Sequence, residues 1–205
     1  ITDFVYALNS ITLILSEADQ TALKTDFGLA VTEATTFIVV GDAMIEDAGG
    51  KGVTAITDDD ALQITAGELT LDTRPAEVTD VKIDFDLKTL TIKFNDVVDA
   101  SSFKVKAVTL QSDSDTDTAA SSYTLQTSTI VDVDGYFMVI SLSAYDELEI
   151  NKLDLLATSD VNTYVTLAST AFKDVDGKNI LAVEPGIQVS TFDDDVTSPT
   201  LDDFD

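Results

Sequence analysis

The chain has 205 residues, 44% of them hydrophobic, and a formal net charge of −27 at pH 7. Its hydrophobic content is sufficient for buried cores, so an ordered protein is expected despite the charge. An acidic surface of this strength repels phosphate backbones and anionic headgroups, which disfavours nucleic acid and membranes as partners. It suits a protein that works in salt or with divalent cations, because these screen self-repulsion.

The chain contains no cysteine, histidine or tryptophan, and this absence narrows its chemistry. Disulfides, thiolate chemistry, imidazole bases and the usual zinc ligands are all excluded. Pairs of carboxylates are expected by chance among 38 acidic residues, so they do not indicate a glycosidase. The glycine-rich segment 49–52 lacks the Ser or Thr that follows Lys in a phosphate-binding loop. We therefore do not expect an enzyme.

No run of about 18 apolar residues is present, so the sequence predicts no membrane insertion. We find no signal peptide and no Asn-x-Ser/Thr site. Any glycan would therefore be O-linked, on Ser and Thr residues that are plentiful.

The first predicted elements are a strand and a short helix. Residues 11–15 (ITLIL) predict a buried strand. The following Ser16, with Asp19 three positions on, is typical of a helix cap and predicts a helix to about Asp26, with Gly28 as its stop.

Short strands and turns are predicted between the helix and the first proline. Residues 36–40 are rich in β-branched and aromatic types and predict a strand, and residues 47–50 predict a turn. Residues 61–65 and 68–71 predict further strands. Arg74-Pro75 then marks a boundary, because proline cannot donate to a strand ladder.

The middle of the chain alternates between apolar and polar residues, which predicts half-buried strands. We expect strands at 81–87, 90–94 and 103–110, and a hairpin of 123–130 with 137–142 across an Asp-Gly turn. About seven strands in some 125 residues favour an all-β, immunoglobulin-like sandwich. The residues expected inside it are Leu90, Ile92, Phe94, Phe103, Leu110, Tyr123, Leu125, Ile140, Leu142, Val165 and Leu167.

An internal repeat connects the two halves of the chain. Residues 36–56 match residues 163–183 at a spacing of 127 positions, and Ser16 and Asp19 match Ser143 and Asp146 at the same spacing. Ser143 accordingly predicts a second short helix, to about Leu155. Further matches are Leu13 with Ile140, Asp47 with Asp174, Gly50 with Gly177 and Lys51 with Lys178.

The phase of the repeat divides the chain into modules of about 125 residues, each with one short helix. Residues 1–75 correspond to the closing part of one module, 76–199 to a complete module and 200–205 to the start of the next. The chain is thus expected to be a window on a longer repetitive polymer. The first part lacks counterparts of the strands between 90 and 130, so we expect it to expose an apolar face.

Two segments resemble bacterial Ig-like repeats of the S-layer (SbsA) type. Residues 90–103, followed by 108–110, are similar to the opening of those repeats, and 164–167 with 173–179 to their closing strand and turn. Comparable repeats occur in giant surface proteins of algae and protists. The first copy departs from the pattern at Gly52, where the family has Asn. The resemblance implies an extracellular structural or adhesive spacer without catalytic residues.

Several acidic clusters are candidates for calcium, which prefers six to eight hard oxygen ligands. None completes an EF-hand loop, and turn chemistry or a solvated surface explains each cluster equally well. Asp58–Asp60 and Asp113, Asp115 and Asp117 form two such clusters. The metal ligands we predict are Asp132, Asp134, Asp174, Asp176, Asp193, Asp194 and Asp195.

These observations predict a non-enzymatic structural protein at the cell surface, made of tandem modules. Its expected partners are copies of itself or neighbouring repeats. A filament, appendage, sheath or surface layer fits this description. The alternative is the spacer arm of an adhesin that binds a glycan or another cell. A filament protein should self-assemble, whereas an adhesin arm should remain a monomeric string.

Overall fold

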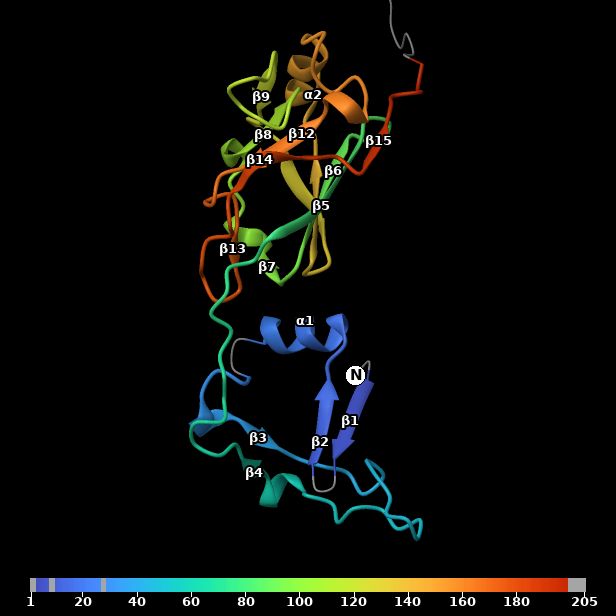
Figure 1. Ribbon diagram of the computed structural model, residues 1–205, viewed down its shortest axis with the longest axis vertical. Coiled ribbons are helices and arrows are strands. Elements are labelled where there is room, and N and C mark those ends of the chain that lie inside the picture. Colours follow the sequence, from blue (N-terminus) through green and yellow to red (C-terminus); the bar gives the residue numbers. More distant parts are fainter. Residues whose placement is uncertain (1–2, 8–9, 27–28, 199–205) are drawn as a thin grey trace, which may run out of the picture. The chain divides into compact units, whose positions relative to one another are not determined.

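The computed structural model describes residues 3–7, 10–26 and 29–198 (Figure 1). The chain divides into two compact units, Ile1–Arg74 and Pro75–Asp205, called unit 1 and unit 2 below. Unit 1 is blue to teal in Figure 1, and unit 2 is green to red. The division falls at Arg74-Pro75, where the sequence analysis places a module boundary.

Unit 1 contains two short antiparallel strand pairs and one α-helix in its described residues. β1 pairs with β2 and β3 pairs with β4. The helix begins as predicted, because the Ser16 hydroxyl accepts a hydrogen bond from the Asp19 N–H. The elements are β1 (Asp3–Ala7), β2 (Ser10–Ile14), α1 (Glu17–Thr25), the 3-10 helix η1 (Glu33–Thr35), β3 (Phe37–Ile38), the 3-10 helix η2 (Asp58–Asp60) and β4 (Leu62–Gln63).

Three strand predictions in unit 1 need correction. The strand predicted at 36–40 extends only over β3, and that at 61–65 only over β4. The segment 68–71 is not a strand: the Glu68 N–H donates to the Thr65 carbonyl, and the turn so formed carries Gly67 at a φ of +85°. Gly28, the predicted helix stop, lies outside the described residues.

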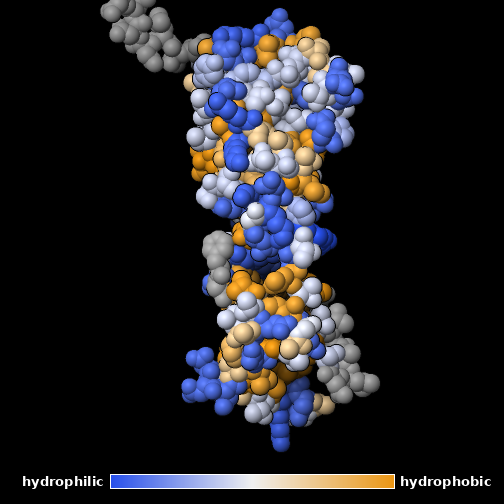
Figure 2. Space-filling view, turned by 90° about the vertical axis from the view of Figure 1, so that its left-hand side faces the viewer, coloured by the Kyte–Doolittle hydropathy of each residue, from blue (hydrophilic) through white to orange (hydrophobic). Residues whose placement is uncertain are grey.

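The apolar residues of unit 1 are exposed. Thr36 is the only buried residue among the described side chains of this unit. Figure 2 shows orange, apolar side chains at its surface among blue, polar ones. The prediction that residues 11–15 form a buried strand is therefore wrong on burial. Ile11 and Leu13 of β2 are 39% and 42% exposed, because β2 pairs only with β1 among the described residues and no second sheet covers it there.

Unit 2 contains two larger sheets and a two-stranded pair. The pairings are antiparallel except that β15 runs parallel to β5. The five-stranded sheet has the order β10 (Thr129–Val133), β11 (Phe137–Ser141), β6 (Thr89–Phe94), β5 (Val78–Asp84), β15 (Thr191–Asp193). The four-stranded sheet has the order β14 (Val183–Gln188), β12 (Tyr164–Leu167), β8 (Val108–Gln111), β9 (Ser122–Thr124), and β13 (Lys173–Asp174) pairs with β7 (Val98–Asp99).

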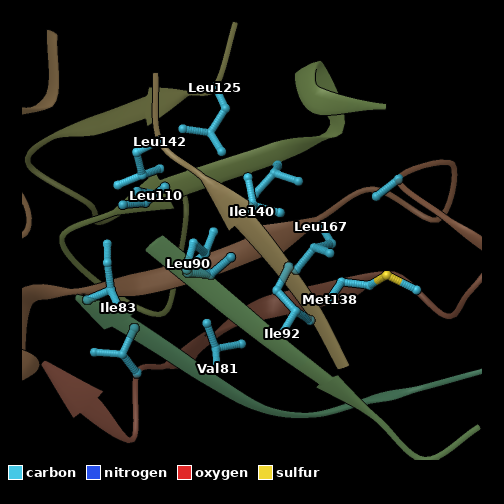
Figure 3. Close-up of a cluster of buried hydrophobic side chains, with 14 of the residues drawn as sticks. Val81, Ile83, Leu90, Ile92, Leu110, Leu125, Met138, Ile140, Leu142 and Leu167 are labelled. Carbon is cyan, nitrogen blue, oxygen red and sulfur yellow. The ribbon is translucent and has the colours of Figure 1, made fainter. Parts of the chain in front are cut away.

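One hydrophobic core joins both sheets of unit 2, and Figure 3 shows its side chains pointing toward one another. Alternate residues of β6 are fully buried, as the period of two predicts. The ring of Phe172 packs against those of Phe94 and Phe103, with centroids 5.3 and 5.0 Å apart. Of the eleven predicted core residues, Phe103 and Tyr123 are half-buried and the others are buried.

Two strand predictions in unit 2 also fail, for local reasons. Residues 103–110 contain a strand only at β8, because Val105–Ala107 form a 3-10 turn in which the Val108 N–H donates to the Val105 carbonyl. Residues 123–130 are split between β9 and β10 of different sheets. The remaining elements are η3 (Ala100–Ser102), η4 (Val105–Ala107), α2 (Ala144–Asn151), which ends before the predicted Leu155, and η5 (Asp160–Asn162).

Candidate functional site

Five predicted metal ligands lie on or beside the two edge strands of the five-stranded sheet, with Asp193 at the end of β15, and three of the five accept hydrogen bonds from nearby backbone N–H groups. The Asp132 carboxylate in β10 accepts the Val133 N–H at 2.9 Å, and Asp134 follows in the turn to β11. The Asp195 carboxylate after β15 accepts the Thr197 N–H, also at 2.9 Å. Asp194 likewise accepts the N–H of the next residue. These are the hydrogen bonds of acidic turns.

The third predicted pair lies at the turn after β13. Asp174 is 2% exposed, and its Oδ1 accepts the Lys178 N–H at 2.8 Å. The Lys178 ammonium lies 3.2 Å from Asp176 Oδ2 and 4.0 Å from Asp174 Oδ2. Asp174 Oδ2 is buried and has no hydrogen-bond partner among the described residues. The cation that faces this pair of carboxylates is therefore the side chain of the chain's own lysine.

The structure does not bring the predicted clusters together. Over the described residues, no group of three or more acidic side chains is placed to hold one ion. Because calcium takes six to eight oxygens, an ion at any one cluster would draw most of its ligands from backbone, water or a neighbouring chain. Calcium binding stays a prediction.

Unit 1 contains a turn with the same hydrogen bonds as the Asp174 turn. The Asp47 N–H donates to the Lys51 carbonyl at 2.8 Å, and Asp47 Oδ1 accepts the Lys51 N–H at 3.0 Å. The Gly50 N–H donates to the Asp47 carbonyl at 3.0 Å, the distance found between Gly177 and Asp174. The glycines have φ angles of +72° and +82°, which favour glycine.

The structure explains the departure at Gly52. A side chain at this position would place its Cβ 2.2 Å from the Asp42 carbonyl oxygen, so only glycine fits. The backbone keeps the same pairing nevertheless: Glu46 bridges Gly52 as Lys173 bridges Asn179.

Other polar contacts also recur between the units at the spacing of the sequence repeat. The Thr36 hydroxyl donates to the Thr32 carbonyl and the Thr163 hydroxyl to the Ser159 carbonyl, both at 2.6 Å. A side-chain amide contact also recurs, at 3.0 Å in both units: Gln63 donates to the Glu33 carbonyl and Gln188 to the Asp160 carbonyl, although the two glutamines are 125 rather than 127 positions apart. Ala30 and Ala157 share a positive φ, of 56° and 52°.

Among the described residues, the carboxylate that accepts the most hydrogen bonds is that of Asp146, a residue predicted only as part of a helix cap. Its side chain is fully buried and accepts hydrogen bonds from the Tyr123 hydroxyl at 2.7 Å and the Ser128 hydroxyl at 2.6 Å. It also accepts the backbone N–H groups of Gln126, Thr127 and Ser128. These bonds hold the segment between β9 and β10 against the start of α2.

Electrostatics favour the charged form of Asp146. Burial by itself raises the pKa of this carboxyl, but the hydrogen bonds from Ser128, Tyr123 and the backbone outweigh it and hold the pKa well below its usual range. Burial and the bond to Asp146 raise the pKa of Tyr123 above its usual value. The cluster is a structural clamp, with a permanent carboxylate and a permanently protonated phenol at neutral pH.

Comparisons with known proteins find only distant structural likeness. No family model and no curated protein matches the sequence. The N-terminal part of the bacterial S-layer protein SbsC is similar at a TM-score of 0.36 and 15% identity, over 53% of this chain and 22% of that one. The SbsC fragment 31–844 is similar at 0.34 and 13%, over 52% and 12%. The chain thus spans less than a quarter of the length of either protein.

Within the described ranges, no helix is long and apolar enough to cross a membrane.

Proposed function

We propose that the chain is a non-enzymatic, structural part of an extracellular surface assembly, built of tandem immunoglobulin-like modules of about 125 residues. The observation that carries the proposal is the recurrence of one set of turn, cap and side-chain contacts in both units. A recurrence at this level of detail supports two copies of one module, because unrelated folds have no reason to share it.

The chemistry of the chain supports a mechanical role. The buried carboxylate of Asp146 accepts hydrogen bonds from six donors, so it has no acceptor position left for a substrate. A formal charge of −27 keeps long chains soluble and favours contacts bridged by cations. Copies of the chain are then the expected partners, in a filament, appendage, sheath or surface layer.

Immunogold electron microscopy tests this function on intact source cells. An antibody against residues 75–205 should label the outside of unpermeabilised cells, with gold particles at regular spacings along an assembly. Isolated labelled stalks would favour an adhesin arm instead. Labelling that needs permeabilisation would contradict the proposal.

A further inference from the structure

We propose that the exposed apolar face of unit 1 is the docking surface of an opening half-module, a stretch of chain with the strand pattern of residues 75–128 joined directly ahead of β1. The face comprises Ile11, Leu13, Leu29, Ile38, Ile45 and Val53. The inference rests on the repeated module proposed above, and not on the surface role.

Each residue of this face has a buried counterpart in unit 2. The face residues are 37 to 51% exposed. Their counterparts, 127 positions later, are at most 2% exposed. The counterparts are Met138, Ile140, Leu156, Val165, Phe172 and Ile180. Unit 1 therefore presents to solvent the side chains that unit 2 uses to close its core.

The residues that cover these counterparts come from the opening half of unit 2. On the five-stranded sheet, β6 lies beside β11, with Ile92 opposite Met138 and Leu90 opposite Ile140. On the four-stranded sheet, Leu110 of β8 lies opposite Val165. Phe172 packs edge-to-face against Phe94 and stacks on Phe103. An occupant of the unit 1 face must supply apolar side chains in this same order.

The strand edges of unit 1 are open where such an occupant would pair. β11 pairs with both β10 and β6, whereas its counterpart β2 pairs only with β1 in the described residues. β12 pairs with both β14 and β8, whereas its counterpart β3 pairs only with β4 there. An incoming segment can thus add one strand to each sheet, with backbone hydrogen bonds for affinity and apolar side chains for register.

The covalent order of unit 2 points to a segment of the same polypeptide. β10 follows the opening half directly, and β1 starts in the same register: Asp3 lies opposite Ile14 as Thr129 lies opposite Ser141, although a β-bulge after Ile130 shifts the rest of β10 by one residue. A donor joined ahead of β1 therefore needs no spanning linker and acts at high effective concentration. A second copy is disfavoured as the donor, because its own residues 75–128 already fill its own core.

A fusion tests the inference as a gain of structure. A second copy of residues 75–128 is placed directly ahead of Asp3 in the chain, and amide hydrogen exchange is compared with that of the unmodified chain. Exchange in β2 and β3 should slow by on the order of 100-fold or more, while unit 2 stays unchanged. The matched control carries Leu90→Asp and Ile92→Asp in the added copy only, and there β2 and β3 should keep their fast exchange.

Three results would overturn the inference. The first is fast exchange in β2 and β3 of a fusion whose unit 2 is folded. The second is slow exchange there in an unmodified chain that sedimentation shows to be monomeric. The third is slow exchange in an unmodified chain that sediments as a dimer, which would make a second copy the occupant. None of them bears on labelling at the cell surface, so this inference and the proposed function fail separately.

Discussion

Unit 1 and unit 2 share several turn and cap hydrogen bonds, but the apolar side chains at equivalent positions are exposed in unit 1 and buried in unit 2. The turns at Asp47 and Asp174 and the caps at Ser16 and Ser143 are formed by the same hydrogen bonds. Yet α1 has no buried residue, whereas α2 buries Asp146 and Ile150. The comparison teaches that turns and caps are specified by their own few residues, while burial depends on segments distant in sequence.

Truncation of equivalent core side chains should separate the units most strongly. Phe172→Ala removes a fully buried ring from the core of unit 2 and should cost about 3–5 kcal/mol. Ile45→Ala, at the equivalent but 40% exposed position, should cost about 0.5 kcal/mol. Urea unfolding followed by far-ultraviolet circular dichroism measures both. Equal costs would show that Ile45 is buried in solution.

The Asp146 clamp gives the next largest expected effect. Asp146→Ala leaves buried donors without an acceptor and should cost about 3 kcal/mol. Tyr145→Ala is the matched control, because this residue is on the same helix but 55% exposed, and its cost should stay within about 0.5 kcal/mol. The same urea titration compares them. A cost for Asp146→Ala as small as the control's would contradict the clamp.

The pH dependence of stability isolates the charge in this clamp. The pKa of Asp146 is lower in the folded state than in the unfolded state, so as the pH falls the unfolded state binds the proton first. Its contribution is therefore complete above the ordinary carboxyl pKa of about 3.9 and is lost as the pH falls toward the folded pKa. The stability difference between the natural chain and Asp146→Ala should be constant from pH 5 to 7 and narrow below about pH 4. A difference that is independent of pH would refute the role of the charge.

The sequence was sufficient for features whose cause is local. Period-two alternation located β5 and β6, the Ser-x-x-Asp pattern located both helix starts, and Asp-x-x-Gly located both turns. These patterns act within a few residues, where propensity and hydrogen bonding decide.

Features that depend on distant partners were beyond the sequence. The alternation in 103–107 fits a strand, but Val105–Ala107 form a 3-10 helix, and the Lys104 N–H before it donates to the carbonyl of Ala171, which is distant in sequence. Asp146 was visible as a cap residue, yet its donors lie about twenty positions upstream and only the fold brings them together. The 4.0 Å contact between the buried carboxylate of Asp174 and the Lys178 ammonium was likewise not predicted from the sequence.

The positive-φ glycines should behave alike in the two units. Gly50→Ala and Gly177→Ala meet no atom closer than 4.0 Å, so the cost of each is conformational strain alone, about 1 kcal/mol. Amide exchange across each turn measures the local destabilisation. Gly41→Ala is a control, because this glycine is not strained and has open space around it. A much larger effect in one unit would show that its turn is coupled to more than local geometry.

Calcium should produce the smallest effect, and one confined to surface turns. Each predicted cluster offers few carboxylates, so we expect weak sites that stabilise by mass action, about 0.4 kcal/mol at a concentration equal to the Kd. In a chain of this length that corresponds to a rise in Tm of about 1–2 °C. Melts in calcium and in magnesium at equal ionic strength separate binding from screening of the −27 charge. The triple variant Asp193→Asn, Asp194→Asn, Asp195→Asn should lose part of the calcium-specific rise, whereas Asp176→Asn should lose little, because Lys178 already faces that carboxylate. Equal melting temperatures in the two ions would identify the acidic clusters as solvated surface.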